Sequence, residues 1–146
     1  MVSTEALGAI RAWTRLEAAI GAFNRDLERR HGVSGAQLAI LRIIGELGPG
    51  LRLADLRQKL VMHPATLGQL LDRLEARGLL ELTVDESDRR RRLVEVTDAG
   101  RRLIERAPLA GPVRLRHVDV DKARLRRLGT ALTDAIVLFG LEEYVS

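Results

Sequence analysis

The sequence predicts a mainly α-helical fold with one small β-hairpin. Apolar residues recur every three or four positions over most of the 146 residues, which is typical of amphipathic helices. Two strand-like runs at 79–84 and 91–96 interrupt this pattern, and a polar stretch at 85–90 separates them. No apolar run approaches the ~20 residues that span a bilayer. The length fits one domain, so we expect a single domain over 1–146 with no membrane partner.

Long helices are expected at both ends of the chain. The segments 4–30 and 121–141 carry apolar stripes that approximate the seam between paired helices. An ordinary core helix carries the same kind of stripe, so the stripes alone leave the packing partner open. We expect 4–30 and 101–146 to form a dimerisation region in which two chains intertwine. The residues expected in this interface are Ile10, Trp13, Ile20, Leu128, Leu132 and Phe139.

Between the two terminal helices, capping and helix-breaking residues divide the chain into short helices. Ser34, with Gln37 three positions later, is typical of a capping box that begins a second helix. The Gly-Pro-Gly sequence at 48–50 ends that helix. A short third helix follows at 53–60, and a break at 61–63 separates it from a fourth.

The fourth helix starts and stops at residues that favour those positions. Pro64 suits the first turn, where its missing N–H costs no hydrogen bond, and Gly78 suits the left-handed residue after a helix. After the hairpin, Thr97 caps a fifth helix at 98–107. The order of helix, tight turn, helix and hairpin within 34–100 is that of a winged helix-turn-helix, a DNA-binding lobe.

The outward face of the fourth helix has the residue types that a major-groove helix needs. Leucines spaced i, i+3, i+4 and i+7 from Leu67 define the buried face. The opposite face is small and polar near its N-terminus, and the amide of Gln69 can address adenine. Gly68 costs about 1 kcal/mol relative to alanine inside a helix, which indicates a close contact there. Neutral drift would leave the same glycine.

Four arginines at 89–92 follow the tip of the predicted hairpin. Along a strand they would alternate, with two pointing to each side. Beside a major-groove helix, guanidinium groups can reach phosphates or the adjacent minor groove. The alternative is a solvated run that Asp85, Glu86 and Asp88 neutralise. The position beside the fourth helix favours contact with nucleic acid.

Three blocks of the chain resemble the multiple-antibiotic-resistance regulator (MarR) family of transcription factors. They are PATLGQLLDRLEARGLLE at 64–81, DESDRR at 85–90 and LVEVTDAG at 93–100. The flanking helices fall in the same order, so the resemblance covers nearly the whole chain. It implies a homodimeric, sequence-specific repressor on a pseudo-palindromic site in double-stranded DNA. It also implies a small aromatic or acidic effector that releases the DNA.

The resemblance assigns roles to single residues. The residues at the family's DNA-contacting positions are Pro64, Ala65, Thr66, Gly68, Gln69 and Arg73. The wing arginines expected to contact DNA with them are Arg89, Arg90 and Arg91. Asp72 and Arg90 match a pair that ties the helix to the wing, and Asp88 matches the wing-tip motif. The residues suggested for an effector pocket are Trp13, Arg11, Arg15 and His31. We favour the simpler alternative of a core tryptophan with solvated arginines.

The chain also departs from the family pattern. Ser87 stands where an arginine commonly reads the minor groove, so Arg89 or Arg91 has to substitute. Leu82 and Thr83 stand where basic residues are common, which weakens phosphate contacts. These departures motivate an alternative function, a winged-helix module for protein interaction with weak or no specific DNA binding.

Composition narrows the functional classes further. Lys plus Arg is 24 and Asp plus Glu is 20, and nearly all of the bases are arginine, which suits phosphates and base edges. Arginine-rich codon usage would produce the same bias. The sequence has no cysteine and no glycine-rich phosphate loop, and its three histidines are scattered. We therefore expect no enzyme, no cofactor and no metal site. No signal peptide is evident, so the expected location is the cytoplasm.

Overall fold

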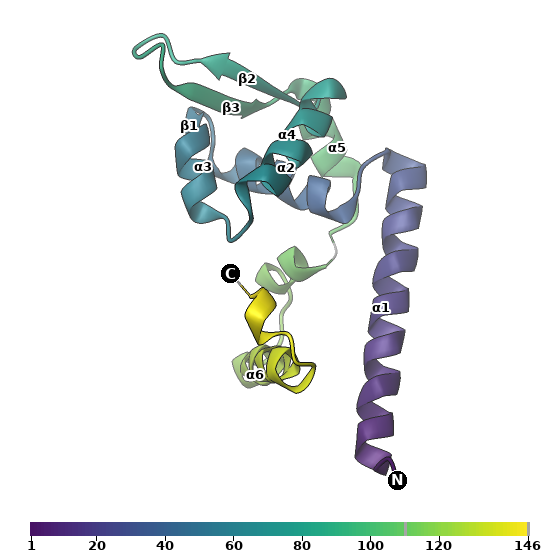
Figure 1. Cartoon of the computed structure of the whole chain (residues 1–146). Coiled ribbons are helices and arrows are strands. Elements are labelled where there is room, and N and C mark those ends of the chain that lie inside the picture. The colour runs from purple at the N-terminus through teal and green to yellow at the C-terminus, as the bar shows by residue number, and fades with distance from the viewer. Residues whose placement is uncertain (110, 146) are drawn as a thin grey trace. The chain divides into compact units, whose positions relative to one another are not determined.

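The computed structural model describes residues 1–109 and 111–145, and the chain forms two compact units (Figure 1). The first unit is Met1–Pro108 and the second is Leu109–Ser146. The single domain expected over 1–146 stays a prediction, and the boundary between the two compact units follows Pro108. Prolines at 108 and 112 end the helical path because proline has no N–H to donate and clashes with the preceding turn.

Helices dominate both units, and a small antiparallel sheet completes the first, so the predicted fold class is confirmed. The elements of the first unit are α1 (Thr4–His31), α2 (Gly35–Leu47), β1 (Leu51–Arg52), α3 (Leu53–Lys59), α4 (Pro64–Ala76), β2 (Leu80–Val84), β3 (Arg92–Val96) and α5 (Asp98–Arg106). The elements of the second are the 3-10 helix η1 (Pro112–Arg116), α6 (Lys122–Leu138) and the 3-10 helix η2 (Glu142–Tyr144). The last helix was predicted to run to residue 141 and ends three residues earlier.

The sheet has three strands in the order β1-β3-β2, where two were predicted. The hairpin has the expected register, with Leu80 opposite Val96. The unpredicted strand β1 pairs with β3 through Leu51, which lies opposite Val94. A strand of two residues has no alternating pattern, so hydrophobic periodicity could not reveal it.

The predicted helix starts are confirmed by hydrogen bonds. The Ser34 hydroxyl accepts from the Gln37 N–H at 3.1 Å, and the Gln37 side chain accepts from the Ser34 N–H at 3.0 Å, which completes the capping box. The Thr97 hydroxyl accepts from the Gly100 N–H at 3.1 Å at the start of α5. These caps satisfy donors that have no partner inside the helix.

The core of the first unit lies between α2, α4 and the sheet. Leu41, Leu56, Leu74 and Val94 are fully buried there. Helix α1 joins this core only near its end, where Leu27 is buried, and all of residues 1–20 are exposed. Among the described helices, none has the length and apolar character to cross a membrane.

Candidate nucleic-acid interface

The N-terminus of α4 is fixed by a histidine, which the sequence pattern did not predict as a cap. His63 is the N-cap, and its Nδ1 accepts from the Ala65 N–H at 3.1 Å. Pro64 occupies the first turn, as predicted. Ser, Thr, Asp and Asn are the residues that usually cap helices, so the pattern gave no signal for a histidine cap.

Helix α4 has one buried face and one exposed face. The buried face consists of Leu67, Leu70, Leu71 and Leu74. Pro64, Ala65, Thr66, Gln69 and Arg73 are exposed. The leucines therefore fix the rotation of the helix, and every residue expected at its DNA-contacting front is accessible except Gly68, which is half-buried.

Gly68 has no structural explanation within the chain. A Cβ at this position would meet no atom within 4 Å, and the backbone is not in the left-handed region. A glycine inside a helix indicates a close contact at that position. The chain itself supplies no such contact, so a close approach would have to come from another molecule.

The far end of α4 is joined tightly to the base of the wing. Gly78 has φ +69°, and the Leu79 N–H donates to the Leu74 carbonyl at 3.0 Å, which closes the helix. The Thr97 hydroxyl donates to the Gly78 carbonyl at 2.6 Å. A Cβ at Gly100 would clash with the Leu79 carbonyl oxygen, so α5 packs directly on this backbone. These contacts hold the base of the wing against the C-terminal end of α4.

The wing tip is a hydrogen-bonded turn closed by Asp85 and Ser87. The Ser87 N–H and hydroxyl both donate to Asp85 Oδ1, at 2.9 and 2.7 Å. These hydrogen bonds from Ser87 stabilise the charged carboxylate and lower the pKa of Asp85. Ser87, which stands where the family commonly has arginine, therefore shapes the turn.

The arginines of the wing differ in how far they are paired. Asp88 Oδ2 lies 3.3 Å from Arg91 Nε, and Asp88 Oδ1 lies 3.8 Å from Arg90 Nε. The Arg90 side chain is 95% exposed against 47% for Arg91. Arg89 is exposed and has no ion pair among the described residues. Arg89 and Arg90 are thus the more available for a phosphate or a groove.

Two predictions about the wing need correction. The alternation of the arginines along a strand was wrong, because β3 begins only at Arg92 and residues 89–91 belong to the turn. The pairing of Asp72 with Arg90 is not formed, since Asp72 has no ion pair within the described part of the chain. Asp88 lies two residues from Arg90, and its Oδ1 also accepts the Arg90 N–H at 3.1 Å. Arg90 therefore pairs with the neighbouring Asp88 in place of the more distant Asp72.

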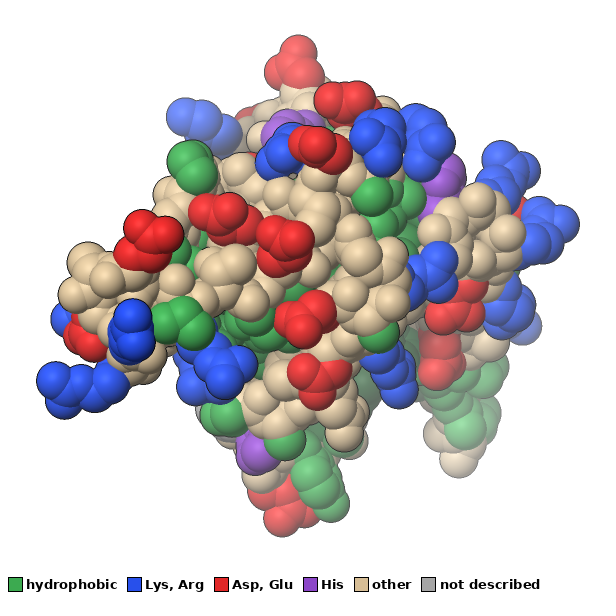
Figure 2. Space-filling view, turned by 90° about the horizontal axis from the view of Figure 1, so that it is seen from above, with side chains coloured by type: hydrophobic (Ala, Val, Ile, Leu, Met, Phe, Trp, Pro, Cys, Tyr) green, Lys and Arg blue, Asp and Glu red, His purple; other side chains and the backbone are tan. Residues whose placement is uncertain are grey.

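The face of the molecule that Figure 2 presents carries charges of both signs. Figure 2 shows basic and acidic side chains interspersed over the face that it presents. Attraction to DNA would therefore depend on the placement of individual arginines rather than on a broad positive field.

The residues suggested for an effector pocket do not converge within one chain. Arg11 and His31 are twenty positions apart on α1, which is about 30 Å at 1.5 Å per residue. Arg11 and Arg15 share a face, whereas Trp13 lies between them on a different face. The favoured alternative is wrong for the tryptophan of the isolated chain, because Trp13 is 45% exposed and does not belong to its core. Arg11 and Arg15 are exposed, as that alternative expected.

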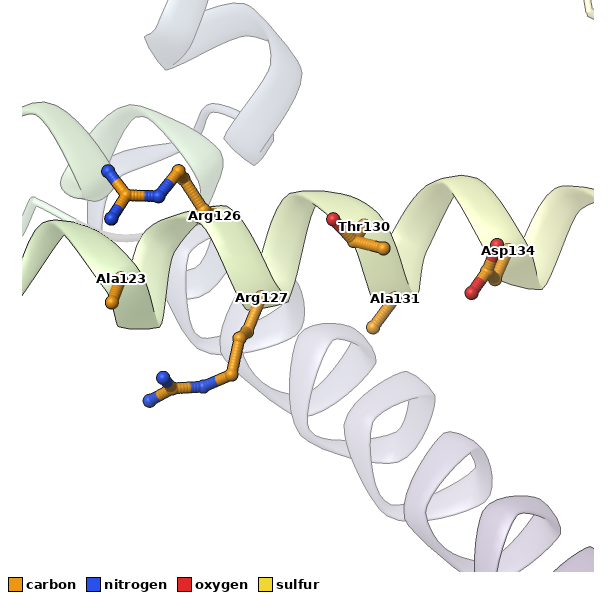
Figure 3. Close-up of a pocket in the computed structure, with 6 residues that line it drawn as sticks. All are labelled: Ala123, Arg126, Arg127, Thr130, Ala131 and Asp134. Atoms are coloured by element: carbon orange, nitrogen blue, oxygen red, sulfur yellow. The ribbon is translucent and has the colours of Figure 1, made fainter.

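A hollow of about 410 Å³ lies along α6 (Figure 3). The residues that line it all belong to this one helix, and they are Ala123, Arg126, Arg127, Thr130, Ala131 and Asp134. Arg126 and Arg127 point to different sides of the helix rather than toward each other. A ligand here would be contacted from one side only, so the hollow does not form an enclosed binding pocket.

A helix-turn-helix followed by a hairpin wing defines the chain as a winged helix-turn-helix protein. Residues 31–91 match the model of the MarR family. The transcriptional regulator HosA of Escherichia coli O157:H7 is 37% identical over 92 residues. The resemblance seen in the sequence is confirmed, and the chain is similar to regulators of the MarR family. The match to HosA spans 63% of this chain and 63% of HosA.

Solved structures share the fold over most of the chain. BpsR of Bordetella bronchiseptica, whose DNA binding is described as regulated by 6-hydroxynicotinic acid, is 25% identical with a TM-score of 0.59. That likeness covers 90% of this chain and 98% of BpsR. MepR of S. aureus, solved in complex with DNA, is 17% identical with a TM-score of 0.62 and covers 94% of this chain and 98% of its own. At that identity MepR supports the fold alone.

Proposed function

We propose that this protein is a repressor of transcription that binds a specific sequence in double-stranded DNA. The observation that carries this proposal is the front of α4, where Ala65, Thr66 and Gln69 are exposed and a row of buried leucines fixes the helix. Short side chains and an amide are what a helix needs to approach base edges in the major groove.

The DNA-facing residues divide into two roles. Gln69 reads a base, because an amide can donate to and accept from adenine at once. Arg73, one turn further along α4, contacts the phosphate backbone. The wing residues Arg89 and Arg90 contact either phosphates or the adjacent minor groove. The helix can approach the DNA closely at its small or short residues, Pro64, Ala65, Thr66 and Gly68. Arg91 contributes to DNA binding and keeps its ion pair with Asp88.

Salt dependence distinguishes this proposal from the alternative of a protein-interaction module. Contacts to phosphates release counterions, so the logarithm of the DNA affinity should fall linearly and steeply with the logarithm of salt concentration. A module for protein interaction would show weak binding that barely changes with salt. The measurement is fluorescence anisotropy with a labelled duplex. Proteins of this family are regulators rather than enzymes, which agrees with the expected lack of a catalytic site.

We also propose that the protein works as a homodimer. Ile10 and Ile20 on α1 are 56% and 50% exposed, and Leu128 and Leu132 on α6 are 40% and 49% exposed. Leaving such rows of large apolar side chains in water is unfavourable, and a second copy presents matching rows. Trp13 and Phe139, at 45% and 48%, belong to the same proposed interface. A single species of monomer mass in sedimentation at micromolar concentration would contradict this.

An aromatic acid is the effector class that we propose. BpsR, a relative in fold and sequence, responds to 6-hydroxynicotinic acid, which is an aromatic acid. Arg11 and Arg15 lie one turn apart on the same face of α1 and can bind a carboxylate together. Titration with a panel of aromatic acids should weaken DNA binding by the wild type and not by a variant with both arginines replaced by glutamine. An equal response of the two proteins would rule out these arginines.

A further inference from the structure

We infer that His63 donates a hydrogen bond from its Nε2 to a DNA phosphate, an inference that rests on the proposed DNA binding. The residue is exposed and precedes Pro64 at the front of α4. Neither the sequence pattern nor the resemblance assigned it a role. One of its two ring nitrogens already accepts a hydrogen bond from the chain.

The hydrogen bond at the helix start determines which ring nitrogen carries the proton. A backbone N–H can only donate, so Nδ1 must be the acceptor in its contact with Ala65. The neutral ring therefore has its proton on Nε2. Because of the fixed geometry of the imidazole ring, the Nε2–H bond points away from the Ala65 N–H that Nδ1 accepts. Among the residues that the structure describes, no acceptor is hydrogen-bonded to it.

Capping alone does not account for a histidine at this position. Serine, asparagine and aspartate are preferred caps and do the same task with a smaller side chain. Histidine has a second polar atom, Nε2, which serine lacks and which the capping hydrogen bond does not use. Ala65 and Thr66, the next exposed residues, are on the face proposed to meet DNA. A phosphate oxygen is the acceptor that the duplex presents most often at such a point.

Replacement of His63 by serine separates the two roles. His63→Ser keeps a preferred cap, so its unfolding temperature should equal or exceed that of the wild type. Its affinity for DNA should fall about tenfold for each half-site, the loss of one hydrogen bond to a charged acceptor, and thus about a hundredfold for a homodimer on two half-sites. The fall should be the same for every sequence, because a phosphate carries no sequence information. The probes are two unrelated duplexes of about 30 base pairs, long enough for two half-sites.

Two further variants complete the test. His63→Asn keeps a cap and has an amide N–H donor that reaches further from the backbone than the serine hydroxyl, so its affinity should lie between those of the wild type and His63→Ser. His117→Ser replaces an exposed histidine of the second unit, and its DNA affinity should equal that of the wild type. If His63→Ser binds both duplexes as the wild type does, the inference is wrong while the proposed function stands. If the wild type itself shows no salt-dependent binding, the proposed function fails first.

Discussion

Replacing Gly68 by alanine should stabilise the protein and weaken its binding to DNA. The new Cβ would meet no atom of the chain within 4 Å, so it causes no strain in the folded protein. Alanine inside a helix is favoured over glycine by about 1 kcal/mol. For a domain of roughly 100 residues this raises the unfolding temperature by about 4 °C. In the DNA complex the same methyl group would enter a close contact.

The cost of that methyl group can be bounded from packing. Inserting a methylene into a well-packed contact costs ~1–3 kcal/mol, so the DNA affinity should fall about tenfold or more. Thermal unfolding followed by circular dichroism and DNA binding by anisotropy give the two values. Gly8→Ala is the matched control, because its Cβ also meets nothing within 4 Å and it lies on α1. A Gly68→Ala protein that is more stable and binds DNA as the wild type does would refute the close approach at this position.

Further predictions concern the wing base, the readout and acid stability. Gly100→Ala should destabilise by ~2 kcal/mol or more in urea unfolding, because its Cβ clashes with backbone; wild-type stability would show that α5 can shift freely. Gln69→Ala should relax the preferred sequence at one base pair in a selection experiment, whereas Arg73→Ala should weaken binding to all sequences alike. The hydrogen bond from Arg101 lowers the pKa of Asp98 below its ordinary 3.8, so its stabilisation is complete above that value and is lost as pH falls through the lowered pKa. The Asp98→Asn protein should therefore lose less stability than the wild type as the pH falls below about 4. The same loss of stability in both proteins would contradict this.

The elements with strong local signals could be predicted from sequence. Ser34 and Gln37 form the expected capping box, and Gly78 takes the left-handed conformation after α4. Each of these features depends on residues within a few positions of one another. Local capping rules therefore determine them without knowledge of the tertiary fold.

Features that depend on contacts across the fold were missed. Strand β1 exists because Leu51 pairs with Val94, and two residues carry no periodic signal. Gly100 is needed because α5 packs on the carbonyl of Leu79, which only the folded chain reveals. The ion pair of Arg90 went to the nearer Asp88 because the tight turn brings those residues together.

Footprinting on DNA selected from the source genome tests the central claim most directly. A homodimer with one α4 and one wing in each copy should protect two half-sites related by a pseudo-twofold axis, with centres about one helical turn apart. Gln69→Ala should retain the spacing and lose discrimination at the same base pair of both half-sites. Protection of a single asymmetric half-site, or no protection of any selected fragment, would contradict the account.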